Sequence, residues 1–112
     1  MSENAFPDII HGLPEADVQL EGVRAWLLQR KEHQLVFWEI EPFGEIPRHS
    51  HGEQWGVVVE GELDLTIGGQ TKRPRAGDSF HIPAGVEHGT TFMTPFRAID
   101  FFGDVDRYQT RG

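Results

Sequence analysis

A chain of 112 residues that is 38% hydrophobic and 25% charged is long enough for one domain with a buried core and too short for two. Its 18 acidic and 10 basic side chains give a net charge of −8 at pH 7, which disfavours nucleic acid and anionic membranes as partners. The sequence has no cysteine and no apolar run approaching the ~20 residues of a membrane span, so we expect a cytoplasmic protein without disulfides or thiolate chemistry.

The first 20 residues differ from the rest of the chain. They are polar and are interrupted by Pro7, Gly12 and Pro14, which break regular structure. We predict that residues 1–20 form an N-terminal arm or a loosely attached first strand. A single domain then spans residues 21–112.

From residue 22 onward, the chain shows short strand-like segments and no sustained helical period. In the clearest of them, Leu63, Leu65 and Ile67 alternate with polar residues, the pattern of a strand with one buried face. Similar segments rich in branched or aromatic residues are 22–29, 34–41, 54–61, 78–82, 89–92 and 96–102. Eight or so short strands predict an all-β sandwich or barrel, closed to limit exposed edges.

The same pattern predicts which side chains fill the interior. We expect a core that includes Val57, Val59, Leu63, Leu65, Phe80 and Ile82. Aromatic residues, 11% of the chain, give the interior bulk and include Trp26, Trp38 and Trp55. The basic stretch 71–75 is expected to be a solvated loop.

Two histidines separated by one residue, His49 and His51, are candidate metal ligands. In an extended strand such residues point to one face, about 6–7 Å apart, and neutral imidazole suits several transition metals. Gln54 can face the same interior from the next strand, and His88 can return to it after a turn.

A His-x-His pair alone is more often a surface pair or a hydrogen-bonded pair than a metal site, so the residues around it must decide. The other histidines, His11, His33 and His81, have no partner at a suitable spacing. We expect these three to be structural or exposed to solvent.

The spacing around the pair resembles the first motif of the cupin superfamily. That motif has His-x-His, then three or four residues, a glutamate, six further residues and a glycine, and here His49, His51 and Gly61 match it. Gln54 stands where the glutamate usually stands. Only two residues separate His51 from Gln54, which is one fewer than usual, so Glu53 stays open as the alternative ligand.

The second cupin motif is matched at every spacing, with Phe92 replacing its asparagine. The matching residues are Gly77, Pro83, Gly85 and His88. The resemblance covers about residues 22–102 and implies a double-stranded β-helix, or jelly-roll barrel. It also implies one divalent metal ion (manganese, iron, nickel or zinc) held by His49, His51, Gln54 and His88.

Three imidazoles and a carboxamide form a neutral ligand set, which favours Lewis-acid chemistry over oxygen activation. The chain is most similar to the small single-domain cupins of unsaturated uronate breakdown, in length, in this ligand set and in segments such as 61–69 and 83–89. That resemblance implies Asp100 as a catalytic base and Arg107 as an anion-binding group. Arg107 lies one position later than the arginine of that pattern, and Arg24 is the second candidate for the anion-binding group.

Three functions remain open from the sequence. The first is a metal-dependent isomerase, lyase or hydrolase acting on a small sugar acid or hydroxy-carbonyl compound. The second is an oxygen-using dioxygenase, and the third is a non-catalytic cupin that binds metal or sugar. The expected partners are a small-molecule substrate and a second copy in a homodimer, which residues 1–20 could reach.

Overall fold

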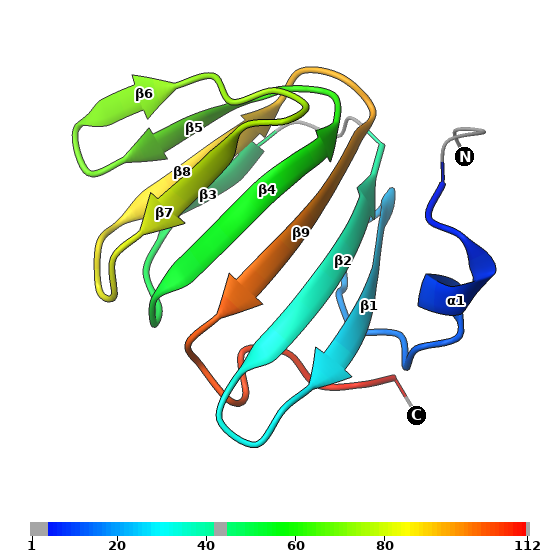
Figure 1. Cartoon of the computed structure of the whole chain (residues 1–112). Coiled ribbons are helices and arrows are strands. Elements are labelled where there is room, and N and C mark those ends of the chain that lie inside the picture. Colours follow the sequence, from blue (N-terminus) through cyan, green and yellow to red (C-terminus); the bar gives the residue numbers. More distant parts are fainter. Residues whose placement is uncertain (1–4, 42–44, 112) are drawn as a thin grey trace.

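Two antiparallel β-sheets form the body of the computed structural model, which describes residues 5–41 and 45–111 (Figure 1). The five-stranded sheet has the order β1 (Val23–Gln29), β2 (Gln34–Ile40), β9 (Phe96–Phe102), β4 (Gln54–Glu60) and β7 (Ser79–Ile82). The four-stranded sheet has the order β3 (Glu45–His49), β8 (His88–Phe92), β5 (Leu63–Ile67) and β6 (Gln70–Lys72). The all-β prediction is confirmed.

Strand β9 holds the middle of the larger sheet, although it is the last strand of the sequence. It pairs along its whole length with β2 and, on its other side, with β4. The turn that follows β4 needs a glycine, because Gly61 has a φ of 85° and an added Cβ would lie 2.3 Å from the Pro95 carbonyl oxygen. The motif glycine thus allows β4 to pass close to the start of β9.

The sequence pattern does not predict β3 or β6. Strand β3 contains Pro47, which cannot donate to a β-ladder, and it lies at a sheet edge where it pairs only with β8. Strand β6 is a three-residue strand that overlaps the start of the predicted loop, and its side chains are exposed. It pairs with β5 across the turn at 68–69. Both strands are too short or too irregular to show a period of two.

The main core lies between the two sheets. Leu63, Leu65 and Ile82 are 3%, 2% and 1% exposed, and the partly buried Phe80 packs against the same core, as predicted. Trp38 also faces this interior. Because side chains from both sheets pack closely here, the two sheets keep a fixed position relative to each other.

The prediction for Val57 and Val59 was wrong. Successive residues of a strand face opposite sides, and on β4 it is Gln54, Gly56 and Val58 that are buried on the inner face. Val57 and Val59 are only partly buried on the outer face. A strand that carries Gln54 inward cannot also carry these two valines inward.

The outer face of the larger sheet has a core of its own. Trp26 and Phe37 pack there against Phe6 of the N-terminal arm, and partly buried Val59 joins this second cluster. Trp55 is 46% exposed on the same face. Of the three tryptophans expected in the interior, only Trp38 lies inside.

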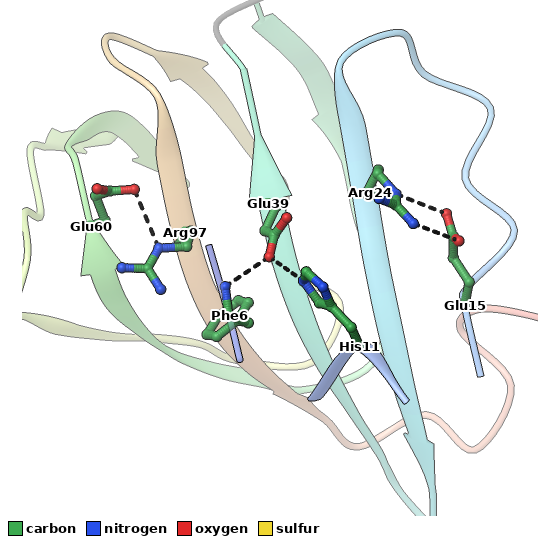
Figure 2. Close-up of polar contacts among 7 residues, drawn as sticks. All are labelled: Phe6, His11, Glu15, Arg24, Glu39, Glu60 and Arg97. Carbon is green, nitrogen blue, oxygen red and sulfur yellow. Dashed lines mark hydrogen bonds and ion pairs between the residues drawn. The ribbon is translucent and has the colours of Figure 1, made fainter. Parts of the chain in front are cut away.

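The described part of the N-terminal arm is fastened to this outer face by polar contacts (Figure 2). Glu39, fully buried on β2, accepts a hydrogen bond from the Phe6 backbone N–H at 2.9 Å and contacts His11 Nε2 at 2.6 Å. Arg24 pairs with Glu15 at 3.2 Å farther along the arm. Residues 1–4 of the predicted arm lie outside the described residues.

A short helix, α1 (Asp8–His11), lies within the segment predicted as an N-terminal arm or a loosely attached first strand. It follows Pro7, whose lack of a backbone N–H is tolerated at a helix start. Among the described residues, no helix is long and apolar enough to cross a membrane. The homodimer stays a prediction. The described part of the arm packs on its own barrel.

We expect Leu65→Ala to lower the free energy of unfolding by about 2–5 kcal/mol, because a fully buried leucine loses transfer energy and leaves a cavity. Leu28→Ala is the control. Leu28 is 39% exposed on the outer face, and its truncation should cost less than about 1 kcal/mol. Equilibrium denaturant unfolding measures both, and a Leu65→Ala loss no larger than that of Leu28→Ala would contradict the assigned face of β5.

Candidate metal centre

Three of the six histidines meet between the sheets. His49 ends β3 and His88 begins β8, and the two are direct partners in the β3–β8 register. His51 lies in the turn between β3 and β4. The ring centroids are 4.3 Å apart for His49 and His88, 4.8 Å for His51 and His88, and 5.3 Å for His49 and His51. One nitrogen from each ring lies within 4.8 Å of the others, so the cluster could hold a metal ion.

The hydrogen bonds of these rings fix which nitrogen is free. In each ring Nδ1 faces a backbone carbonyl oxygen, at 3.0 Å (His49 to Pro47), 2.8 Å (His51 to Gly52) and 3.0 Å (His88 to Val86). A carbonyl can only accept, so each Nδ1 carries the proton and donates. In the neutral form of each ring, Nε2 then keeps its lone pair, which is the form that binds a metal.

The surroundings also favour the neutral form of two of the rings. Burial lowers the pKa of both His51 and His88, because a charged imidazolium loses its hydration there. The nearby positive charge of Arg107 lowers both pKa values further. The chemistry of the donor set therefore fits a divalent cation of the kind that neutral imidazole binds.

Gln54 and Glu53 point in opposite directions at the start of β4. Gln54 is 8% exposed and lines the cavity beside the three histidines. The Glu53 side chain is 62% exposed and contacts His81 Nε2 at 2.6 Å outside the barrel. Geometry thus brings Gln54, and not Glu53, to the histidine cluster.

The remaining histidines lie away from the cluster. His11 stacks on Trp26 with 4.2 Å between ring centroids, and His33 lies 5.0 Å from the ring of Phe101. The His81 side chain is 51% exposed. These positions agree with the structural or exposed roles expected from their spacing.

The histidines line a cavity of about 80 Å³ between the sheets. Apolar side chains from both sheets form most of its wall. Its polar lining consists of His49, His51, Gln54, His88, Thr90, Asp100, Arg107 and Tyr108. The cavity adjoins a vestibule of about 500 Å³, and the two share residues that include His49, Arg107 and Tyr108.

Asp100 points into this cavity from β9, on the same face as Phe102, and is 7% exposed. Burial raises the pKa of its carboxyl to about 7, and the neighbouring Gln54 and Trp38 side chains oppose that rise. Asp100 is paired across the strands with Gly56, where an added Cβ would lie 2.1 Å from Asp100 Oδ1. The glycine leaves room for the carboxyl.

Unpartnered polar atoms collect at the same place. Among the described residues, five buried side-chain atoms lack a hydrogen-bond partner, and four belong to residues that line the cavity. These four are Trp38 Nε1, Thr90 Oγ1, Asp100 Oδ1 and Arg107 Nε. Burying such groups without partners costs free energy, so their concentration here indicates a site for a polar ligand.

The two candidate arginines have different positions. The Arg107 guanidinium lies 4.6 Å from the centroid of the Tyr108 ring and borders both the cavity and the vestibule. Arg24 pairs with Glu15 and lies over Trp26 at 4.8 Å on the outer face. Arg24 is therefore far from the cavity lining.

Sequence reasoning missed Trp38, Thr90 and Tyr108 as site residues. Alternation along β2 could place Trp38 on the inner face, since Val36 and Ile40 are buried in the same cluster. Nothing local marks Thr90. Tyr108 follows the last strand, and its position depends on contacts with distant parts of the chain.

Comparisons with known proteins agree with this architecture. The H2HPP isomerase of Bacillus subtilis is 36% identical over 80 residues, which cover 70% of this chain and 34% of that protein. The chain thus spans about a third of this curated relative. Among solved structures, an RmlC-like cupin of Shewanella frigidimarina is 29% identical, with a TM-score of 0.73 over 91% of this chain and 90% of that one.

KdgF from a Halomonas species has the same fold, with 23% identity and a TM-score of 0.70 over 78% of this chain and 83% of that one. The family profile of the cupin domain, Cupin_2, matches residues 36–102. That match covers more than half of the chain and includes both motifs up to the end of β9. The protein belongs to the Cupin_2 family of cupin domains.

Proposed function

We propose that the protein is a metal-dependent isomerase acting on a small anionic substrate, a sugar acid or a related hydroxy-carbonyl compound. One observation carries the proposal: three imidazole lone pairs, a buried carboxyl and a guanidinium border a single cavity, and four buried polar atoms of its lining residues lack a partner among the described residues. The curated relative from Bacillus subtilis is also an isomerase by name, which supports the reaction class.

In this proposal His49, His51 and His88 hold one divalent ion through Nε2, and the Gln54 side-chain oxygen completes the set. Manganese, iron, nickel and zinc all accept such ligands. When bound, the ion supplies a Lewis acid that polarises a substrate oxygen. The neutral ligands leave its charge undiminished, as expected for chemistry that uses no oxygen.

Asp100 is proposed as the group that moves a proton during isomerisation. Isomerisation needs a base to take a proton from one atom and return it to another. Asp100 is the carboxyl that lines the cavity, and its Oδ1 has no partner among the described residues. The role is assigned from this position, not from the pKa, because a bound cation would oppose the effect of burial.

Arg107 is proposed as the group that binds the negative charge of the substrate. In a chain of net charge −8, an anion needs a local cation to stay at the site. Arg107 lines both the cavity and the vestibule, and its buried Nε has no hydrogen-bond partner in residues 5–41 and 45–111. A substrate carboxylate held there would place the neighbouring carbon atoms toward Asp100 and the histidines.

The proposed activity can be tested by a substrate screen of the metal-loaded protein. Sugar acids and oxo acids are incubated in deuterated buffer under argon and under air, and NMR follows product formation and solvent deuterium uptake. We expect conversion under argon with deuterium in the product. Conversion that requires air would instead indicate an oxygenase, and binding without conversion would indicate a binding module.

We expect His51→Ala to lower the affinity for the divalent ion by at least about 10-fold, because one of three imidazole ligands is lost. Elemental analysis of protein purified without chelators measures the bound metal. His81→Ala is the matched control, since His81 is exposed outside the barrel and should keep the parental metal content. Equal metal content in the parental protein and His51→Ala would contradict the proposed centre.

Asp100→Asn keeps the shape of the side chain and removes the base. With a substrate from the screen, we expect turnover to fall by about 10²-fold or more, while folding and metal content stay parental. Asp106→Asn, a change at an exposed aspartate, should leave turnover unchanged. Parental turnover in Asp100→Asn would exclude Asp100 as the base.

A further inference from the structure

The backbone of His51 is held in place by other contacts than the backbones of His49 and His88. His49 and His88 end or begin paired strands, so the β3–β8 ladder fixes their backbone. His51 lies in the β3–β4 turn, outside any strand. Its position depends on contacts that this turn makes with other loops.

Two loops grip the turn from separate parts of the chain. From the loop before β8, the Gly85 N–H donates to the His51 carbonyl oxygen at 2.9 Å. From the segment after β9, the Gly103 N–H donates to the Glu53 carbonyl oxygen at 2.7 Å. The side chain of Asp104 adds a third contact, accepting a hydrogen bond from the Gly52 N–H at 3.0 Å through Oδ2.

Asp104 is closely seated against the turn. A Cβ added to Gly52 would lie 1.9 Å from Asp104 Oδ1, so this approach requires a glycine at position 52. Asp104 Oδ2 also lies 3.9 Å from His51 Nδ1, which is too far for a hydrogen bond. The contact therefore acts on His51 through the backbone of the turn.

We propose that Asp104 is a positioning residue for the metal centre. Its hydrogen bond to the Gly52 N–H holds the turn so that His51 Nε2 faces His49 and His88. Gly52 also supplies the carbonyl that fixes the His51 ring through Nδ1, so one residue links the carboxylate to the ring. The inference rests on the proposed function, in which His51 binds the metal.

The test measures the affinity of the purified protein for Co²⁺ by competition with a chromophoric chelator. Asp104→Ala should weaken Co²⁺ binding by about 10- to 100-fold, the usual effect of removing an outer partner of a metal ligand. Asp104→Asn keeps an oxygen that can accept from the Gly52 N–H and should stay close to the parental affinity. Asp106→Ala, an exposed change two residues away, should match the parental protein.

A second variant disturbs the contact between Asp104 and Gly52 by changing Gly52. Gly52→Ala drives a Cβ into the Asp104 carboxylate and should also weaken Co²⁺ binding. If both changes break one contact, the double variant Gly52→Ala/Asp104→Ala will lose less affinity than the product of the single losses. Circular dichroism and a thermal melt establish that each variant is folded.

Parental Co²⁺ affinity in folded Asp104→Ala would overturn the inference, and so would an Asp104→Asn variant as weak as Asp104→Ala. The inference would also be overturned if the fold loss of Co²⁺ affinity in the double variant equals the product of the two single losses. A folded parental protein that does not bind Co²⁺ would overturn the metal centre itself. That result differs from failure of the Asp104 role alone, where the parental protein binds and Asp104→Ala binds equally well.

Discussion

Burial of the two inner sheet faces against each other is the constraint on which the site depends. His49 and His88 come from the smaller sheet, whereas Gln54 and Asp100 come from the larger one. The packed apolar side chains around these residues set where they meet. Burial of apolar surface stabilises this packing by about 25 cal/mol for each Å² removed from water. Close packing resists displacement, so two sheets joined by apolar contacts can hold polar groups at fixed separations.

The same packing surrounds a cavity whose lining contains polar atoms unpartnered among the described residues. A fully apolar interior would be the more stable arrangement, because unpartnered donors and acceptors lose their hydration on burial. Trp38 Nε1, Thr90 Oγ1 and Asp100 Oδ1 nevertheless lack hydrogen-bond partners within the part of the chain that the structure describes. Proteins carry such costs mainly at functional sites, where a ligand supplies the missing bonds. The surrounding core offsets this cost.

The two cupin motifs and the strand alternation could be predicted from the sequence because both are local patterns. Leu63 and Leu65 follow a clean period of two and are buried as expected. The run Val57 to Val59 has no alternation of its own, so its register follows from the inward position of Gln54 and from pairing with β7 and β9. The prediction that Trp26 fills the barrel interior was wrong for another reason. The arm creates a second core outside the barrel, which no pattern within β1 reveals.

The mouth of the cavity is built from the two ends of the described chain, where sequence patterns say least. The Asp17 N–H donates to the Gln109 carbonyl at 2.7 Å, and the Gln34 side chain bonds both backbone groups of Tyr108. These contacts hold Tyr108, and Arg107 beside it, at the vestibule although neither residue lies in a strand. The sheets thus fix the histidine cluster and Asp100, whereas the paired ends of the described chain line the vestibule beside it. Since loops outside a core accept substitutions more readily than strands inside it, the lining of the vestibule can change here without disturbing the histidine cluster.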